Sequence, residues 1–373
     1  MTEREQQIMD LLRQDPMLPQ GEIAKRLGIT RSSVGVHLTN LSKKGLILGK
    51  GYVLAEQSAP YVVGIGAANV DLMGRSRESL VMEDSNPGII SMSVGGVTHN
   101  ICENAARMGA AVKLITVTGD DVYGEKIRRE CETAGIDTSG FMVVEGESSS
   151  TYLSLHDANG EMALALSDMR VLQKLSVDFL KSRHKLLRSA GAIVMDGGLP
   201  QEILDYVTAT YGAEIPIFAD TVSTTYARKF KGKLHGYHTI KPNRLETEII
   251  AGRSIGGQDD LKKACFELLA QGPERIVVSE GRRGCLYVDQ TGKTLRAYGP
   301  PMEQVVNATG AGDAFMGALV YASLAGLSVE KTLLFATGAS RMAISHQNTI
   351  NPNISAENIW ALVERDHLKV EAV

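Results

Sequence analysis

The chain has 373 residues, more than one average domain, and its 43% hydrophobic and 22% charged residues are ordinary for a globular protein. A net charge of −4 excludes a chain-wide basic surface for nucleic acid, and no apolar run reaches the ~20 residues that a membrane helix needs. Four widely spaced cysteines form no CxxC pair, and the first residues are too charged for a signal peptide, so we expect a cytoplasmic protein with reduced thiols.

Residues 1–58 form a predicted head, in which eight Lys/Arg stand against six Asp/Glu. Apolar residues at helical spacing predict one short helix around Ile8, a second in "PQGEIAKRLG" and a third in "TRSSVGVHLTNLSKKG". The stretch "LILGKGYVL" then predicts two strands around a Gly-Lys-Gly turn. This order resembles the small winged helix-turn-helix domains that bind DNA.

The third predicted helix of the head carries the candidate DNA contacts. Short polar and basic side chains at its start can reach base edges in a major groove, and these are Arg31, Ser32, Ser33 and His37. Lysines nearby can contact phosphates, namely Lys43 or Lys44 and Lys50 in the wing. A net charge of only about +2 would bind DNA weakly, so two heads in a dimer would be needed. The alternative is a helical module for dimerisation or protein contact.

Residues 59–373 alternate short apolar runs with helical stretches, which predicts an α/β fold with a mainly parallel sheet. Ligands bind at the carboxyl ends of such strands. Polar residues that end these runs are therefore site candidates, although Asp and Asn also cap helices: Asn69, Asp71, Asp196, Asp220, Lys241, Asn243 and Ser279. Two segments break the alternation, at about 73–94 and 148–167, and are expected to form a lid or a dimer surface.

Three motifs in the body have both a structural and a functional interpretation. "SVGGVTHN" places two glycines before a helix, where the backbone can approach a ligand or simply turn. In "KPNRLE", Asn243 and Glu246 suit either a magnesium shell with waters and phosphate oxygens or a helix cap. "VVSEGRRGCLYV" is either a nucleotide-binding turn or an ordinary hairpin.

The segment "NATGAGDAFMGAL" places small residues before an apolar helix, an arrangement that binds anions through free backbone N–H groups. A spectator carboxylate at Asp313 would repel a phosphate in that position. If Asp313 instead accepts the proton of an attacking hydroxyl, its place beside the anion hole is explained. The N–H groups of Ala311 and Gly312 would hold the charge on the phosphoryl oxygens.

With these motifs, residues 61–373 resemble the ribokinase-like phosphofructokinase-B family of sugar and nucleoside kinases. The resemblance implies a three-layer sandwich with a β-lid, a homodimer, and ATP with Mg²⁺. It implies Asp313 as the general base and Gly310, Ala311 and Gly312 as the anion hole. The positions implied to bind ATP are Asn243, Ser279, Gly281, Gly284 and Thr309, and those implied to organise magnesium are Asn243 and Glu246. The acceptor-binding positions implied are Asn69, Asp71, Gly95, Gly96, Thr98, Asn100 and Asp168.

Three separated segments, "EDSNPGIISMSVGGVTHNICENAARMG", "LALSDMRVL" and "ADTVSTTYARKF", look like the pseudouridine kinases within this family. The resemblance implies phosphorylation of a nucleoside 5′-hydroxyl, with other nucleosides or sugars such as adenosine, inosine, ribose and fructose as alternatives. Asp168 could either contact the base or cap a helix that starts near Ser176. Asn307 stands where most of the family has an Asp of a monovalent-cation site, which leaves potassium activation open. His99 stands where many relatives have a basic residue such as Arg, and it has no assigned role.

A different class of function is also compatible with the sequence. The head favours a ligand-sensing transcription regulator built on a kinase fold. Against it, Asp313, the glycine turn, Asn243 and Glu246 are all present, and loss of catalysis usually removes at least one such residue. The two roles could also coexist in one chain.

Overall fold

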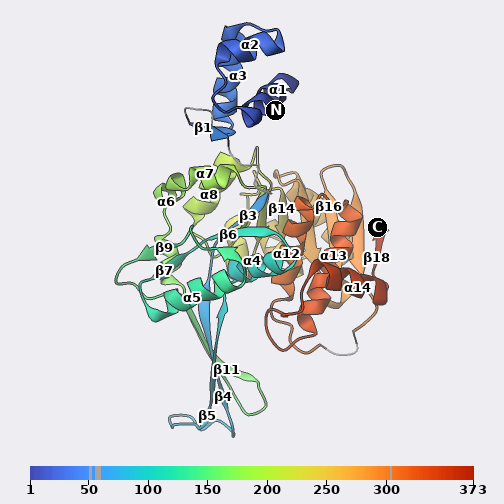
Figure 1. Ribbon diagram of the computed structural model, residues 1–373. Helices are drawn as coiled ribbons and strands as arrows, with labels where there is room; N and C mark the ends of the chain where they lie inside the picture. The colour runs from blue at the N-terminus through green and yellow to red at the C-terminus, as the bar shows by residue number, and fades with distance from the viewer. Residues whose placement is uncertain (50–52, 55–59, 303–304) are drawn as a thin grey trace. The chain divides into compact units, whose positions relative to one another are not determined.

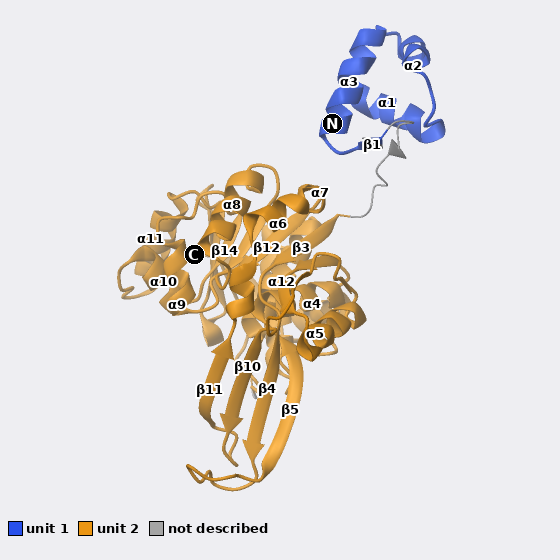
Figure 2. Cartoon of the chain, turned by 90° about the vertical axis from the view of Figure 1, so that its left-hand side faces the viewer, with its two compact units in different colours: residues 1–59 blue, residues 60–373 orange. Residues whose placement is uncertain are grey.

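The computed structural model describes residues 1–49, 53–54, 60–302 and 305–373. The chain divides into two compact units, Met1–Ala59 and Pro60–Val373, which Figure 2 distinguishes by colour. The predicted boundary between residues 58 and 59 lies outside the described residues.

The first unit contains three helices and a short strand pair. The helices are α1 (Glu3–Gln14), α2 (Gln20–Leu27) and α3 (Arg31–Lys43), and the strands are β1 (Ile47–Gly49) and β2 (Val53–Leu54). Thr2 and Thr30 cap α1 and α3, and Gly28 ends α2 in the left-handed conformation. A core of its own includes Ile8, Leu12, Ile23, Val34 and Leu41. This confirms the predicted helix-turn-helix region, while the turn with Lys50 lies outside the described residues.

The second unit is built on a ten-stranded sheet, called here the main sheet, with the order β18-β17-β16-β15-β14-β13-β12-β3-β6-β8. Neighbours from β8 to β15 pair in parallel, and β15 to β18 pair antiparallel. The bounds are β3 (Tyr61–Ile65), β6 (Ala111–Ile115), β8 (Ile136–Asp137), β12 (Ala192–Asp196), β13 (Ile217–Asp220), β14 (Thr239–Lys241), β15 (Arg275–Ser279), β16 (Cys285–Asp289), β17 (Thr294–Tyr298) and β18 (Lys369–Ala372).

Helices cover both faces of the main sheet, as Figure 1 shows. Successive residues of β3 enter different cores, with Val62 in one cluster and Val63 in the other, because side chains alternate along a strand. The first cluster packs under α4 (Val97–Arg107), α12 (Ala311–Leu324), α13 (Val329–Ile344) and α14 (Ala356–Arg365). The second packs under α8 (Gln201–Tyr211), α10 (Arg244–Ala251) and α11 (Gln258–Leu269). This confirms the predicted three layers.

A second sheet of four strands, called here the lid, extends away from the main sheet (Figure 2). Its order is β11-β10-β4-β5, with β4 (Asn69–Ser76), β5 (Gly88–Gly95), β10 (Thr151–His156) and β11 (Met162–Asp168). Among the described residues, no helix is both long and apolar enough to cross a membrane.

The two faces of the lid differ in chemistry. Its polar face is defined by four residues that lie side by side in the strand register: Ser93, Asp71, Tyr152 and Ser167. Its apolar face is defined by exposed side chains on the other side of the same strands: Ile90, Met92, Leu155, Leu164 and Leu166. Near the main sheet the apolar face is covered by core contacts, because Val70 is fully buried and Leu72 packs against the first cluster.

Candidate active site

Charged and polar side chains end four neighbouring parallel strands of the main sheet. Asp196 ends β12, Asp220 ends β13, Lys241 ends β14 and Ser279 ends β15. The sequence predicted that these strand ends would meet at one edge, and the sheet order confirms it. The amino end of α12 belongs to the same edge, since Lys241 lies against Gly312.

The backbone at the start of α12 leaves its first N–H groups free. Gly310 caps the helix with φ of +81°, and a Cβ at this position would lie 2.2 Å from the Thr349 carbonyl oxygen. Only glycine fits this turn without displacing backbone. Ala311, Gly312 and Asp313 follow in the first helical turn, where N–H groups have no intrahelical acceptor. The geometry is that of an anion site.

Asp313 projects from this first turn and accepts a hydrogen bond from Asn100 Nδ2 at 2.8 Å. The pKa of the Asp313 carboxyl is raised to about 7, mainly by loss of hydration and next by the nearby Asp220 charge. The bond from Asn100 and the Lys241 charge act in the opposite direction. A carboxylate with a pKa near neutrality is suited to general base chemistry.

Lys241 is a site residue to which the sequence analysis gave no role. Its ammonium lies 3.0 Å from Asp220 Oδ2, and both side chains are buried. Burial opposes the charge on Lys241, but Asp220 outweighs it, so its pKa is raised and the ammonium persists at neutral pH. A Cβ at Gly312 would lie 3.3 Å from Lys241 Nζ, which places a cation beside the anion site.

Asn243 and Glu246 form the helix cap that was one of their two predicted interpretations. Asn243 Oδ1 accepts from the Glu246 backbone N–H at 2.9 Å, and Glu246 accepts from the Asn243 backbone N–H at 2.8 Å. Glu246 also accepts from Asn243 Nδ2 at 2.8 Å and from Thr221 Oγ1 at 2.6 Å. The carboxylate is buried and has little capacity left for a direct metal bond.

This arrangement fits a magnesium ion that keeps its own waters and phosphate ligands, since Mg²⁺ often needs only one or two protein carboxylates. Within the part of the chain that the structure describes, no group of three or more His, Cys, Asp or Glu side chains is placed to hold a metal ion.

The predicted nucleotide turn lies between β15 and β16. Ser279 forms a parallel bridge with Asn243, which joins this turn to the start of α10. Gly284 has φ of +82°, and a Cβ there would lie 1.9 Å from the Ala297 carbonyl oxygen, so it is required for the turn. Gly281 has open space above it and could admit a ligand. Thr309 begins the α12 turn and donates its N–H to Asn307 Oδ1 at 2.9 Å.

The predicted acceptor residues divide into two groups. Asn69 Nδ2 donates to Asp71 Oδ1 at 2.6 Å, and a Cβ at Gly95 would lie 2.2 Å from Asp71 Oδ2. Glycine at this position therefore makes room for the Asp71 carboxylate, whose pKa is raised by burial and lowered by the bond from Asn69. Gly96, with φ of +102°, turns the chain into α4, which carries Asn100 to Asp313.

Thr98 belongs to the second group, because its side chain is fully buried. Its hydroxyl donates to Asp196 Oδ2 at 2.6 Å, and the Ala67 N–H donates to the same oxygen at 2.9 Å. Gly198 donates to the other oxygen, Oδ1, at 2.7 Å. These contacts hold the loop after β3 against α4, so the geometry favours a positioning role for Thr98 over contact with an acceptor.

Asp168 ends β11 on the opposite side of the lid from Asp71. It binds the Arg170 guanidinium at 2.7 Å, which, with a backbone bond from the same residue, lowers the Asp168 pKa to about 2. Tyr152 and Ser167 share the face of Asp71 together with Ser93, and the sequence analysis selected none of these three. The helix expected near Ser176 is α6 (Val177–Ser182), and it is capped by Ser176, whose side chain accepts from the Phe179 N–H, and not by Asp168.

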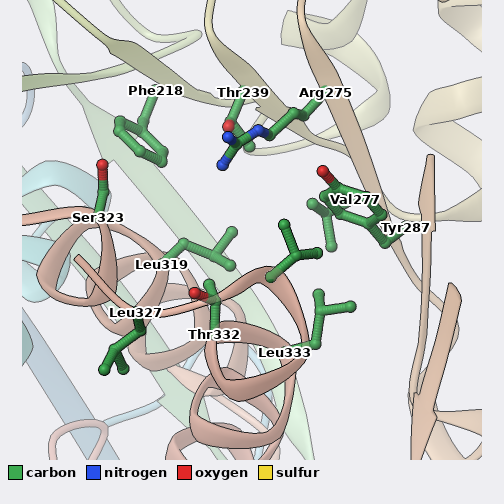
Figure 3. A pocket seen from close by; sticks show the side chains of 11 residues that line it. Phe218, Thr239, Arg275, Val277, Tyr287, Leu319, Ser323, Leu327, Thr332 and Leu333 are labelled. Atoms are coloured by element: carbon green, nitrogen blue, oxygen red, sulfur yellow. The ribbon is translucent and has the colours of Figure 1, made fainter. Parts of the chain in front are cut away.

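A small cavity of about 40 Å³ lies at the other end of the strands, lined by Thr239 and Arg275 at the starts of β14 and β15. Figure 3 shows the Arg275 guanidinium directed into it, opposite Leu319 of α12. This space suits one or two waters and is too small for a nucleoside. It is distinct from the strand-end site.

In the head, the predicted DNA contacts lie at the surface of α3. Arg31 and Ser32 are exposed, and Ser33 and His37 are half-buried. Lys44 is engaged within the head, because its ammonium lies 2.7 Å from the buried Glu5 carboxylate. That pair makes Lys44 a weaker phosphate contact than Lys43.

Comparison with known sequences identifies both units. The profile of the pfkB family carbohydrate kinases matches residues 59–356. The chain belongs to the pfkB family. A second profile, of winged helix-turn-helix DNA-binding domains, matches residues 1–47. The pfkB match covers the strand ends, the α12 turn and the lid.

Two relatives from Escherichia coli K12 are each 37% identical. One is described as the uncharacterized sugar kinase YeiI and aligns over 97% of this chain and 99% of its own, which includes the head. The other is a pseudouridine kinase, aligned over 82% of this chain and 96% of its own. The ribokinase of Arabidopsis thaliana, solved with ribose and ATP, has the same fold with a TM-score of 0.73 at 21% identity, over 82% of this chain and 99% of its own.

Proposed function

We propose that this pfkB kinase transfers the γ-phosphoryl group of ATP to the 5′-hydroxyl of a nucleoside, and that pseudouridine is the acceptor. The observation that carries the proposal is the position of Asp313. Its carboxyl has a pKa of about 7 and lies in the first turn of α12, beside free N–H groups and the Lys241 ammonium.

The reaction follows from this geometry. The acceptor 5′-oxygen attacks the γ-phosphorus, a new O–P bond forms, and the bond to the β,γ-bridging oxygen breaks as ADP leaves. Asp313 takes the hydroxyl proton, a contribution typically of 10²–10⁴-fold in rate. Charge on the transferring oxygens is stabilised by the N–H groups of Ala311 and Gly312 and by Lys241.

ATP and Mg²⁺ complete the proposed site. Ser279 and Gly281 lie at the turn where the nucleotide would pass, and Asn243 and Glu246 would hold magnesium-bound waters. Magnesium supplies neutralisation of phosphate charge. We do not propose activation by potassium, since both ends of the Asn307 amide are engaged, one with the Thr309 N–H and one with the Gln347 carbonyl.

Two observations favour a nucleoside over a bare sugar. The E. coli pseudouridine kinase is 37% identical, and a guanosine-inosine kinase of Exiguobacterium acetylicum is 26% identical over 78% of this chain. The polar face of the lid also carries Tyr152 next to Asp71. Asp71 would bind ribose hydroxyls, and the adjacent phenol ring offers a surface on which a base can stack.

A homodimer through the apolar face of the lid is also proposed. Ile90 is 79% exposed and Leu166 is 62% exposed, and both belong to a row of apolar side chains on one face. Such a surface usually marks an interface, and a second lid offers matching chemistry.

The head supports a second role, which is DNA binding. The alternative to a kinase is a ligand-sensing transcription regulator built on a kinase fold. Its winged helix-turn-helix profile and its exposed Arg31 and Ser32 favour this role. We propose a kinase that also binds DNA as a dimer, which brings two heads together. If the two activities are coupled, nucleoside or ATP will change the affinity for DNA. A gel shift that does not change with either ligand would contradict this coupling.

The proposal is tested by ATP consumption with magnesium across pseudouridine, uridine, adenosine, inosine, ribose and fructose. Turnover greatest with pseudouridine is the expected result. Turnover greatest with ribose or fructose would refute the nucleoside assignment but keep the kinase. Nucleoside binding without any turnover would instead favour the ligand-sensing transcription regulator.

A further inference from the structure

His99 is a buried side chain that contacts Asn100, the residue that binds the candidate base Asp313. The proposed mechanism gives it no role. It lies in the first turn of α4, with 1% of its surface exposed, next to Asn100 at 6%. His99 Nδ1 lies 3.2 Å from Asn100 Oδ1, and Asn100 Nδ2 lies 2.8 Å from Asp313 Oδ2. The three side chains form one line of hydrogen bonds.

The orientation of the Asn100 amide decides what Asp313 experiences. An amide has a donor end and an acceptor end of nearly equal shape, so a flip exchanges them. In the observed orientation the NH₂ group faces the carboxylate and stabilises its charge. In the flipped orientation the Oδ1 lone pairs would face the carboxylate, which disfavours the ionised form.

Two side chains contact this amide among the described residues: Asp313 favours the NH₂ end only while its carboxylate is ionised, and His99 is the other contact. The backbone carbonyl of Asn100 accepts from Asn104 Nδ2 at 2.7 Å and its backbone N–H donates to Gly96, but neither bond involves the amide. A proton on His99 Nδ1 can be donated only to Oδ1. A flipped amide would place an NH₂ group against that proton.

The contact of His99 Nδ1 with Asn100 Oδ1 requires a proton on Nδ1, because an amide oxygen only accepts hydrogen bonds. Burial lowers the pKa of His99, so the ring is neutral and carries one N–H, although Glu103 and Glu130 act in the opposite direction. The Nε2 atom has no hydrogen-bond partner in the described part of the chain and lies 3.6 Å from Glu103 Oε2, beyond hydrogen-bond range. Glu103 is already bound by Arg107 at 2.7 Å.

We propose that His99 is a positioning residue for phosphoryl transfer: its Nδ1–H holds the Asn100 amide with the donor end toward Asp313, where it stabilises the carboxylate form of the base. The inference rests on the proposed kinase function. Asp313 also faces Asp220 and Asp196, which disfavour its charge, and Lys241, which favours it. Loss of the ordered amide leaves these charges unchanged and removes one favourable contact.

The test compares two amide substitutions that differ in where they place a donor. His99→Asn keeps an amide near the position of Nδ1, whereas His99→Gln places it near Nε2. His238→Gln is the matched control, since His238 is half-buried and bonded through Nδ1, to Thr239 at 2.8 Å, but lies at the other end of β14. Thermal melting checks that each variant is folded.

The acidic limb of kcat against pH should move upward by about one pH unit in His99→Gln, so that activity at pH 6 falls about tenfold while activity at pH 8.5 is retained. His99→Asn and His238→Gln should follow the wild type. An unshifted limb in His99→Gln, or equal shifts in both His99 variants, would overturn the inference.

A second readout separates this inference from the proposed function. Carboxyl ¹³C NMR of aspartate-labelled protein, with Asp313→Asn to assign the signal, reports the Asp313 pKa without turnover. A pKa raised in His99→Gln supports the positioning role even if no tested acceptor is phosphorylated, and an unchanged pKa refutes it. Wild-type protein inactive on every acceptor would refute only the proposed function.

Discussion

The clearest quantitative consequence of the site is a rate that depends on pH through Asp313. A shift of its pKa from 3.8 to about 7 corresponds to about 4 kcal/mol against the ionised form. A base of this pKa is roughly one tenth ionised at pH 6 and nine tenths at pH 8, so kcat/KM should rise about ninefold between them. An unperturbed carboxyl would give a flat profile over this range.

Asp220→Asn probes one cause of that shift. It removes the negative charge that raises the Asp313 pKa, while Lys241 keeps Glu246 and Asp313 as neighbours that favour its ammonium. The acidic limb should therefore move to lower pH. Because loss of one partner of a buried ion pair costs about 3–5 kcal/mol of stability, thermal melting must accompany the kinetics.

The assay is direct chromatographic measurement of the nucleoside phosphate from pH 5 to 9, with magnesium in excess so that the state of ATP is constant. A wild-type profile that is flat between pH 6 and 8 would refute the role of the perturbed carboxyl. A limb that moves to higher pH in Asp220→Asn would refute the assigned cause.

Three further predictions concern stability, the acceptor and the head. Because the Asp313 pKa is raised in the folded state, ionisation of this carboxyl disfavours folding increasingly as pH rises from about 4 to 7. Asp313→Asn should therefore raise Tm at pH 8 and have no effect near pH 3. Equal gains at both pH values would contradict this. Tyr152→Ala should lower kcat/KM for a nucleoside about 10- to 100-fold but not for ribose, and Tyr152→Phe should retain it; equal losses on both acceptors would exclude stacking. Arg31→Ala should weaken DNA binding in a gel shift without a change in kinase rate, whereas unchanged DNA binding would place the contacts elsewhere.

Much of the fold could be predicted because its signals are local and repeated. Apolar runs that end in Asp196, Asp220 and Lys241 predicted a parallel sheet, and parallel strands necessarily bring their carboxyl ends to one edge. The Gly310 turn was equally accessible, since small residues directly before an apolar segment predict a turn into a helix from local sequence alone.

The site residues of the lid were harder to predict, because the face on which a strand residue lies depends on a register that the sequence does not specify. Asp168 was implied by the family resemblance, but successive residues of a strand point to opposite faces, and Ser167 shares the face of Asp71 instead. Tyr152 and His99 have no local motif, and their surroundings are assembled from segments far apart in the chain.

The interpretations of "KPNRLE" proved not to exclude one another. Asn243 and Glu246 form the predicted cap, and the same geometry leaves an arrangement that fits magnesium held through water. Sequence alone cannot separate these uses, because both require an amide and a carboxylate at a three-residue spacing.

The most direct test of the central claim compares wild type and Asp313→Asn for transfer of phosphate from ATP to pseudouridine at pH 8. The account predicts pseudouridine 5′-phosphate and ADP in equal amounts from the wild type, and a rate at least 100-fold lower in the variant, with nucleoside binding retained. A variant that transfers phosphate at the wild-type rate would contradict the assignment of Asp313 as the base.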